Sequence, residues 1–309
     1  MFIKFALLSL ILSLFASDAN CATTKKRPFY NIGHMVNNMS EINIFLDRGC
    51  NALEMDLRFN MKGETIAFAH YNPCDCGREC DGISEVDEYL QYTRKITTPG
   101  TVGYRKSYAL MLIDLKSTDI PLQYMYVAGK LLVDVLYRNL FDSGKSTSKL
   151  QVLLSLELTK QKDFIKGFIE EMQSKGLEST MGKFIGWQIS VNEKISVIHD
   201  MWEEIKNVTK IWYSHGITNC IVQALNFDRG ERMIKMRDEC NVEQDPYCPK
   251  KVYFWSVDSK KQLRRLLRTN VDGFITNRAK RLTKILAEEE FKAKFRLATV
   301  DDDAFAIFK

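Results

Sequence analysis

The chain has 309 residues, enough for one large domain with a sizeable hydrophobic core. Its formal net charge of +5 favours anionic surfaces only mildly and is far from the basic stripe of a nucleic-acid-binding protein. We therefore expect no nucleic-acid partner.

The N-terminus has the organisation of a secretory signal peptide. A short start containing Lys4 leads into an apolar run over residues 5–16, and small and polar residues follow up to Ala22. Residues 1–21 are thus predicted to be removed near Cys21 or Ala22, which leaves 22–309 as a secreted, extracellular catalytic domain. A membrane anchor is the alternative, but the run is shorter than the ~20 apolar residues that a spanning helix needs.

Secretion makes disulfides the expected state of the remaining cysteines. Seven remain after cleavage behind Cys21: Cys50, Cys74, Cys76, Cys80, Cys220, Cys240 and Cys248. The odd number leaves one thiol over, and Cys50, which precedes an apolar run, is the candidate for a buried free cysteine. Zinc binding by the cluster at 74–80 is the alternative, although its spacing does not match a paired C-x2-C site.

Apolar runs and amphipathic segments alternate along the chain. The runs expected to form strands are 29–32, 52–59, 65–69, 108–115, 151–158, 184–189, 211–213, 252–257 and 273–276. The segments with helical spacing include 41–48, 122–137, 162–175 and 260–268. About eight such units predict a single-domain α/β fold, the (β/α)8 TIM barrel. Segment 230–251, rich in charge and containing two prolines, is expected to be a surface excursion.

Polar side chains end several of the predicted strands. Residues at i and i+2 of a strand share a side, so Glu54 and Asp56 face one way together, as do Asp114 and Lys116. In a parallel barrel the carboxyl ends of all strands meet at one mouth, where catalytic groups lie. The residues expected there are His34, Glu54, Asp56, His70, Asp114, Lys116, Trp255, Asp258 and Asn277.

The carboxylates and histidines of this set indicate metal-assisted phosphate or ester chemistry. Glu54, Asp56 and Asp114 offer the hard oxygen ligands that Mg²⁺ prefers, with Ca²⁺ as a second possibility. Imidazole can move protons near neutral pH, and ligation of a transition metal by His34 and His70 is the alternative. The other two histidines, His199 in a helical stretch and His215 in a turn-like segment, are expected to be structural or surface groups.

Several motifs together resemble the sphingomyelinase D (phospholipase D) toxin family of spider venoms and its tick and mite relatives. The resemblance covers nearly the whole mature chain. The motifs are Asn31-Ile32-Gly33-His34-Met35-Val36-Asn37, Glu54-Met55-Asp56, Pro73-Cys74-Asp75-Cys76-Gly77-Arg78-Glu79-Cys80, Thr97-Thr98-Pro99-Gly100, Asp114-Leu115-Lys116, Gly216-Ile217-Thr218-Asn219-Cys220, Trp255-Ser256-Val257-Asp258, Ile275-Thr276-Asn277 and the tail Ala298-Thr299-Val300-Asp301-Asp302.

The resemblance implies a barrel related to glycerophosphodiester phosphodiesterases, with one Mg²⁺ held by Glu54, Asp56 and Asp114. It implies that His34 and His70 are catalytic, that Asp75 positions His70, and that further residues surround or support the substrate. These are Lys116, Tyr253, Trp255, Asp258 and Asn277, although Tyr253 could equally fill the barrel interior. Matching the family also pairs Cys74 with Cys80 and Cys76 with Cys220, whereas the pair Cys240–Cys248 is our own expectation.

The implied substrates are choline phospholipids, sphingomyelin or lysophospholipids, at membrane or lipoprotein surfaces. The neighbouring hydroxyl of the lipid would displace choline and form a cyclic phosphate. We expect His34 as the base and His70 as the acid, and a phosphohistidine route would use the same residues. A hydrolytic glycerophosphodiester phosphodiesterase and a non-catalytic lipid-binding protein are the alternative functions.

The chain departs from the family pattern in three places. Tyr71-Asn72 stands where the spider toxins usually carry Gly-Ile, His215 stands in place of Asp, and the tail reads Asp303-Ala304-Phe305 instead of Asn-Pro-Trp. Two sequons, at Asn38 and Asn207, would permit glycosylation. We expect a monomer.

Overall fold

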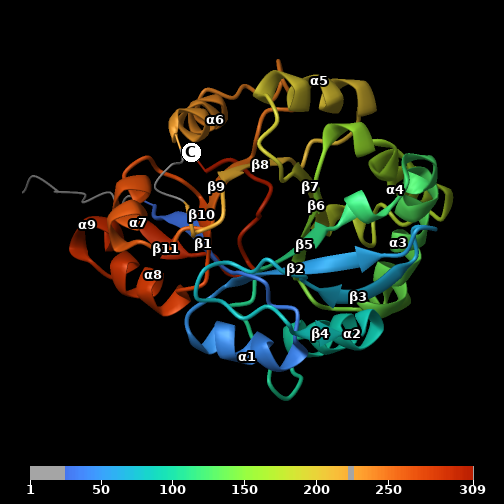
Figure 1. Ribbon diagram of the computed structural model, residues 1–309, viewed down its shortest axis with the longest axis horizontal. Helices are drawn as coiled ribbons and strands as arrows, with labels where there is room; N and C mark the ends of the chain where they lie inside the picture. Colours follow the sequence, from blue (N-terminus) through green and yellow to red (C-terminus); the bar gives the residue numbers. More distant parts are fainter. Residues whose placement is uncertain (1–24, 222–225, 309) are drawn as a thin grey trace, which may run out of the picture.

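The computed structural model describes residues 25–221 and 226–308 of the chain (Figure 1). The signal-peptide prediction for residues 1–21 therefore lies outside the described residues. Within the described part, no helix is both long and apolar enough to cross a bilayer.

Eight parallel strands form a barrel that follows the chain order. A single bridge between Trp187 and Ile211 joins β7 to β8, so the barrel is nearly closed. The strands are β1 (Arg27–Gly33), β2 (Ala52–Phe59), β5 (Leu110–Leu115), β6 (Gln151–Leu156), β7 (Ile185–Ile189), β8 (Trp212–Gly216), β9 (Lys251–Trp255) and β10 (Gly273–Thr276). The predicted (β/α)8 fold is confirmed.

Helices surround the barrel (Figure 1). They are α1 (Met39–Asp47), α2 (Val86–Thr97), α3 (Met125–Asn139), α4 (Asp163–Ser174), α5 (Ile195–Ile205), α6 (Asp228–Asp238), α7 (Lys260–Leu267), α8 (Ala279–Leu286) and α9 (Glu289–Lys292). The amphipathic segments predicted at 41–48, 122–137, 162–175 and 260–268 correspond to α1, α3, α4 and α7 with shifted ends. In α7, Leu263, Leu266 and Leu267 are buried while the lysines and arginines face outward, as the helical period requires.

The strands are apolar on both faces because each one borders two hydrophobic layers. In β5, Met111, Ile113 and Leu115 pack in the layer between barrel and helices, whereas Leu110 and Leu112 pack inside the barrel. The same alternation points Asp114 into the barrel. In β2, Leu53 and Met55 face the helices, so Glu54 and Asp56 also point inward.

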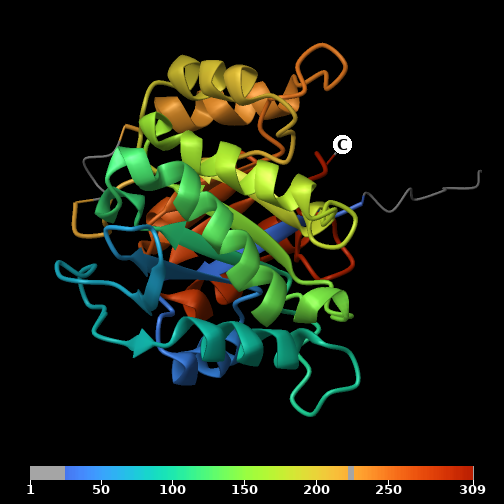
Figure 2. The same cartoon turned by 90° about the vertical axis from the view of Figure 1, so that its right-hand side faces the viewer.

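The predicted strand at 65–69 does not belong to the barrel. It forms β3 (Thr65–Ala69), which pairs antiparallel with β2 and also with β4 (Ile83–Ser84). A hairpin therefore rises from the end of β2, and the loop between β3 and β4 projects from the molecule (Figure 2). This hairpin returns the chain to the barrel mouth at His70.

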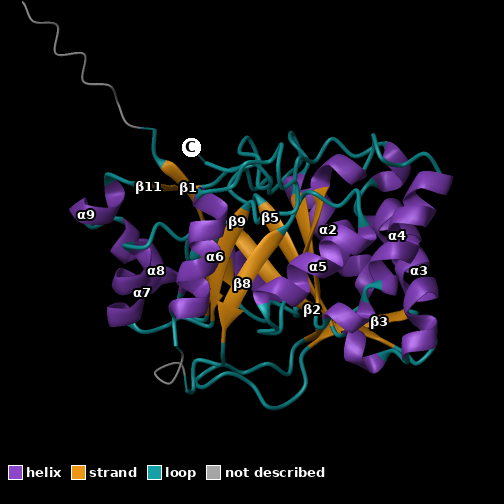
Figure 3. Cartoon of the chain, turned by 90° about the horizontal axis from the view of Figure 1, so that it is seen from above, coloured by secondary structure: helices purple, strands orange, loops and turns teal. Residues whose placement is uncertain are grey.

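The C-terminal tail closes the opposite end of the barrel. Strand β11 (Phe295–Leu297) pairs with the start of β1, and Ala298, Ala304 and Phe305 complete the interior apolar cluster. The Trp212 indole N–H donates to the Ala304 carbonyl at 2.8 Å. Loops gather at both ends of the strands (Figure 3), but only the end opposite the tail carries the candidate catalytic residues.

The predicted surface excursion at 230–251 is partly wrong. Its first part belongs to α6, where Gly230, Met233, Ile234 and Arg237 are buried because they pack on the barrel, and Arg237 pairs with Asp272. Only the part after Asp238 is a loop, and the disulfide Cys240–Cys248 closes it.

All three expected disulfides are present: Cys74–Cys80, Cys76–Cys220 and Cys240–Cys248. Cys50 is the free cysteine among the described residues, and it is buried, as predicted. Zinc binding by the cysteines at 74–80 is excluded because each of them is in a disulfide.

Candidate active site

Three carboxylates converge at the barrel mouth. Glu54 and Asp56 come from β2 and Asp114 from β5, and the strand register places Asp56 directly beside Asp114. One oxygen of each lies within 4.8 Å of the others. Glu54 and Asp56 are buried, so little water solvates their charges. The predicted grouping of these three residues is therefore what the fold produces.

Lys116 lies between two of these carboxylates. Its Nζ is 2.7 Å from Asp56 Oδ1 and 2.5 Å from Asp114 Oδ2. Although burial alone would lower it, the charges of Asp114, Asp56 and Glu54 raise the pKa of Lys116 well above its ordinary value. The lysine is thus a fixed positive charge at the centre of the site.

Further hydrogen bonds orient the carboxylates. The Asn37 side-chain amide donates to Asp56 Oδ2 at 2.7 Å and accepts the Asp56 backbone N–H at 2.7 Å. The Met35 backbone N–H donates to Glu54 Oε2 at 2.7 Å, and the Ser155 hydroxyl donates to Asp114 Oδ1 at 3.0 Å. Each ligand candidate therefore has at least one oxygen held by the protein, which fixes the direction of its carboxylate.

The charge balance of this cluster fits a divalent cation. Burial and the neighbouring charge of Asp56 raise the pKa of Glu54 to about 8, because three carboxylates face one ammonium group. A hard cation would remove this excess of negative charge, and oxygen-only ligands suit Mg²⁺ or Ca²⁺. Glu54, Asp56 and Asp114 are the residues that would hold it.

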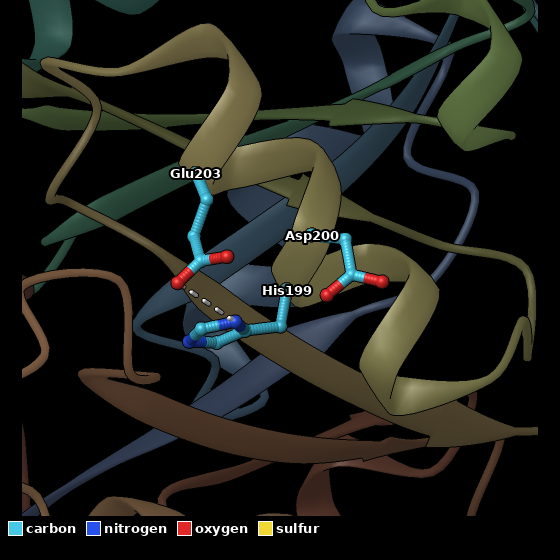
Figure 4. Close-up of side chains that lie close together, drawn as sticks. All are labelled: His199, Asp200 and Glu203. Atoms are coloured by element: carbon cyan, nitrogen blue, oxygen red, sulfur yellow. Dashed lines mark ion pairs between the residues drawn. The ribbon is translucent and has the colours of Figure 1, made fainter.

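A second group of potential ligands lies on the surface of α5. His199, Asp200 and Glu203 are close in space (Figure 4), but His199 pairs with Asp245 at 3.1 Å, and Asp200 and Glu203 are exposed. Neighbours on one exposed helix commonly approach in this way without binding an ion. This arrangement agrees with the prediction that His199 is a surface group.

The two candidate catalytic histidines lie in different surroundings. His34 follows β1, and its Nε2 is 4.0 Å from Glu54 Oε2, while its Nδ1 is 3.0 Å from Asp75 Oδ2. Burial opposes protonation, but the hydrogen bond to Asp75 and the charges of Glu54 and Asp75 raise the pKa of His34 to about 9. Burial lowers the pKa of His70. Two imidazoles with separated pKa values can divide acid and base roles.

The expectation that Asp75 positions His70 is wrong. Asp75 contacts His34, and His70 Nδ1 has no hydrogen-bond partner within the described part of the chain. Asp75 also accepts hydrogen bonds from Thr218 at 2.7 Å and Asn277 at 2.9 Å. Disulfides at Cys74 and Cys76, on either side of it, and these two contacts hold Asp75 on the His34 side of the mouth.

Asp258 and Asn277 help to hold Asp75 in place. Asp258 accepts hydrogen bonds from the Asn277 backbone N–H at 2.9 Å, from the Thr276 hydroxyl at 2.7 Å and from the Asn219 amide at 2.7 Å. Neither Asp258 nor Asn277 is among the described residues that line the cavity above the carboxylates. They therefore position Asp75, and through it His34.

A cavity of about 380 Å³ opens above the carboxylates. His34, His70, Lys116, Tyr253 and Trp255 line it, as expected. Tyr253 is buried within the interior apolar cluster, and the Gln188 amide donates to its hydroxyl at 2.6 Å. Tyr253 thus fills the barrel interior and also forms part of the cavity floor, and its contact with substrate stays a prediction.

The structure locates Tyr71 and His215, two residues at which the sequence departs from the family pattern, and the two sequons. Tyr71 is half exposed at the rim, and the guanidinium of Arg58 lies 4.4 Å from its ring centre. His215 is not in a turn, because β8 continues to Gly216, and its imidazole is buried. Of the two sequons, Asn38 caps α1 by accepting the Ser40 N–H at 3.0 Å, whereas Asn207 is exposed.

Sequence analysis missed Glu157, which lines the cavity. It continues the inward-facing period of β6, after Leu153 and Ser155, and this alternation is the signal that could have identified it. Asn37 and Thr218 were also missed, and they follow no such period because both lie in loops.

Comparison with known proteins shows which protein family this chain matches. Residues 24–305 match the family model described as Dermonecrotic toxin SPH. Dermonecrotic toxin Hl-PLD1 of Hemiscorpius lepturus is 37% identical over 280 residues, which cover 90% of this chain and 84% of the relative. Dermonecrotic toxin LcsSicTox-betaIC1 of Loxosceles cf. spinulosa is 36% identical over 275 residues, which cover 89% of this chain and 98% of the relative.

Solved structures with a similar fold include proteins named as glycerophosphodiester phosphodiesterases. A putative one from Silicibacter pomeroyi has a TM-score of 0.53 at 12% identity, covering 88% of this chain and 97% of that protein. One from Parabacteroides distasonis has a TM-score of 0.53 at 14% identity, covering 86% and 100%. At these identities the likeness concerns the fold alone.

Proposed function

The chain belongs to the Dermonecrotic toxin SPH family, as its motifs indicated, and we propose that it is a secreted, Mg²⁺-dependent phospholipase D of the sphingomyelinase D type. Its substrates would be sphingomyelin and lysophospholipids, from which it would release choline. The observation that carries this proposal is the convergence of Glu54, Asp56 and Asp114 with Lys116 and two histidines beneath one cavity.

The residues around the cavity support a division of labour on a phosphodiester. When bound, Mg²⁺ would supply positive charge and Lewis acidity at the phosphate oxygens. Lys116 is held where it can stabilise the negative charge that develops on the phosphate. Trp255 also lines the cavity and can offer a ring face to a quaternary ammonium, a contact worth about 2 kcal/mol when water is excluded.

The attacking group would be the neighbouring hydroxyl of the lipid, which forms a cyclic phosphate as choline leaves. A well-placed intramolecular hydroxyl reaches effective molarities of roughly 10⁵ M or more, so no bound water is needed as the nucleophile. One histidine takes the hydroxyl proton and the other protonates the leaving oxygen. We expected His34 as the base, whereas the hydrogen bond to Asp75 and the charge of Glu54 raise the pKa of His34 and favour it as the acid.

Product analysis separates this proposal from a hydrolytic glycerophosphodiesterase on the same fold. The purified protein is incubated with sphingo- and lysophospholipids, with and without EDTA, and the products are identified by phosphorus NMR. A cyclic phosphate signal that EDTA abolishes supports the proposal, whereas an open phosphomonoester supports hydrolysis. A non-catalytic lipid-binding protein would give neither product, and His34→Ala would then change nothing.

Secretion is part of the same proposal. The apolar N-terminal run and the disulfides favour the secretory route, and cleavage behind residue 21 would yield the mature enzyme. Expression in insect cells followed by N-terminal sequencing of the medium tests it. Glycosylation is proposed at the exposed Asn207, and a glycosidase-dependent mass shift that Asn207→Gln removes is the expected result.

A further inference from the structure

The cavity has two unlike halves. Strands β1, β2 and β5 and the loops after them contribute the metal-ligand candidates, Lys116 and the histidines. Strands β6 to β9 contribute the other half, whose side chains are mainly uncharged: Ser155, Ser190, Val191, Thr218, Tyr253 and Trp255. Among the described residues that line this half, Glu157 is the one charged side chain.

Glu157 is held in a definite position. It follows β6 directly, and its Oε2 accepts the backbone N–H of Thr118 at 2.6 Å. The Val191 backbone N–H donates to the Glu157 carbonyl at 3.2 Å, which ties the residue to the loop after β7. Burial raises the pKa of Glu157, because its carboxylate is only partly solvated. A cation beside it would offset that loss of solvation.

The proposed metal ligands, histidines and Lys116 account for the chemistry of the reaction without Glu157. Glu157 is not one of the three clustered carboxylates, and the ammonium group of Lys116 is already paired with Asp56 and Asp114. The partly buried carboxylate of Glu157 faces the cavity and forms no ion pair within the part of the chain that the structure describes, so its charge is incompletely balanced there. A cationic ligand group would balance it.

The inference rests on the proposed function. A zwitterionic phospholipid carries its phosphate and its ammonium on one short headgroup, so a phosphate at Lys116 places the ammonium within the same cavity. We propose that Glu157 is the specificity-determining counter-charge for the headgroup cation, and that Trp255 contributes the aromatic surface. The site would therefore select phospholipids with ammonium headgroups over those with neutral ones.

The test uses Glu157→Gln and a matched control, Glu193→Gln. Glu193 performs the same local task one strand further along, because it accepts the Thr159 backbone N–H at 2.7 Å, but it does not line the cavity. The substrates are three lysophospholipids that differ only in their headgroup, which is choline, ethanolamine or glycerol. Inhibition by free choline, with inorganic phosphate for comparison, is measured on all three proteins.

We expect Glu157→Gln to lower kcat/KM about tenfold for the choline and ethanolamine lipids, mainly through KM. It should leave the glycerol lipid unchanged and weaken inhibition by choline but not by phosphate. Glu193→Gln should behave like the wild type. An equal loss on all three lipids, or unchanged inhibition by choline, would overturn the role of Glu157. A wild-type protein that cleaves none of the lipids would instead refute the proposed function.

Discussion

Replacing Asp75 with asparagine tests the contact on which the orientation of His34 depends. The change removes a charge 3.0 Å from His34 Nδ1 and keeps the size of the side chain. In the wild type, the hydrogen bond to Asp75 and the charges of Glu54 and Asp75 overcome burial and raise the pKa of His34 from 6.5 to about 9. This shift corresponds to about 3 kcal/mol in favour of the protonated imidazole.

We assign about 2 kcal/mol of that stabilisation to Asp75, since Glu54 remains in the variant. Because the folded pKa is raised above the unfolded value, the stabilisation is fully present below pH 6.5 and is lost as the pH rises through about 9. The stability difference between wild type and Asp75→Asn should follow the same pH dependence. In the metal-free protein, the pKa of His34 should fall toward 6.5.

Two measurements check this reasoning. NMR titration of the imidazole signals reports the pKa of His34, and steady-state assays should give a kcat/KM that is lower by about 100-fold or more, as for other carboxylate–histidine pairs. Asp245→Asn serves as the control, because Asp245 pairs with the surface histidine His199 at 3.1 Å and is not among the described residues that line the cavity. An unchanged His34 pKa in Asp75→Asn, or a shift confined to His70, would refute the assignment of Asp75 to His34.

Three further predictions follow from the metal site, the disulfides and a buried histidine. Asp114→Asn should raise the Mg²⁺ concentration for half-maximal activity by about 10-fold or more, as measured by Mg²⁺ titration after EDTA treatment. An unchanged Mg²⁺ concentration for half-maximal activity would show that Asp114 is not a metal ligand. Replacing both Cys76 and Cys220 with serine should lower the free energy of unfolding in urea by about 4–5 kcal/mol, and replacing both Cys240 and Cys248 should lower it by about 2–3 kcal/mol. The difference is expected because Cys76–Cys220 closes a loop with a separation of 144 residues and Cys240–Cys248 closes a loop with a separation of 8. Equal losses would contradict the dependence on loop length. Burial lowers the pKa of His215, so its contribution to stability is present above pH 6.5 and is lost as the pH falls. In thermal melts, the Tm of His215→Gln should therefore fall less steeply with decreasing pH than the Tm of the wild type. The same dependence of Tm on pH in both proteins would contradict this prediction.

The barrel could be predicted from the sequence because about eight short apolar runs, typical of parallel strands that are covered on both faces, alternate with amphipathic segments. Glu54, Asp56 and Asp114 could be grouped because strand alternation and register decide where they point. The same reasoning could not distinguish β3 from a barrel strand, since five apolar residues look alike in a hairpin and in a barrel. It also assigned Asp75 to the wrong histidine, because loop conformation and two disulfides determine that contact.

The barrel floor is completed by residues 298–305, which follow all eight barrel strands in the chain. Phe305 packs against Gly186, and Ala304 accepts the Trp212 indole N–H, so the interior of the barrel stays open to water until residue 305 has been made. Cooperative folding is therefore expected only after this segment has left the ribosome. A stop codon shortly before Ala298 would leave every catalytic side chain in place in the sequence and still yield a barrel that cannot close.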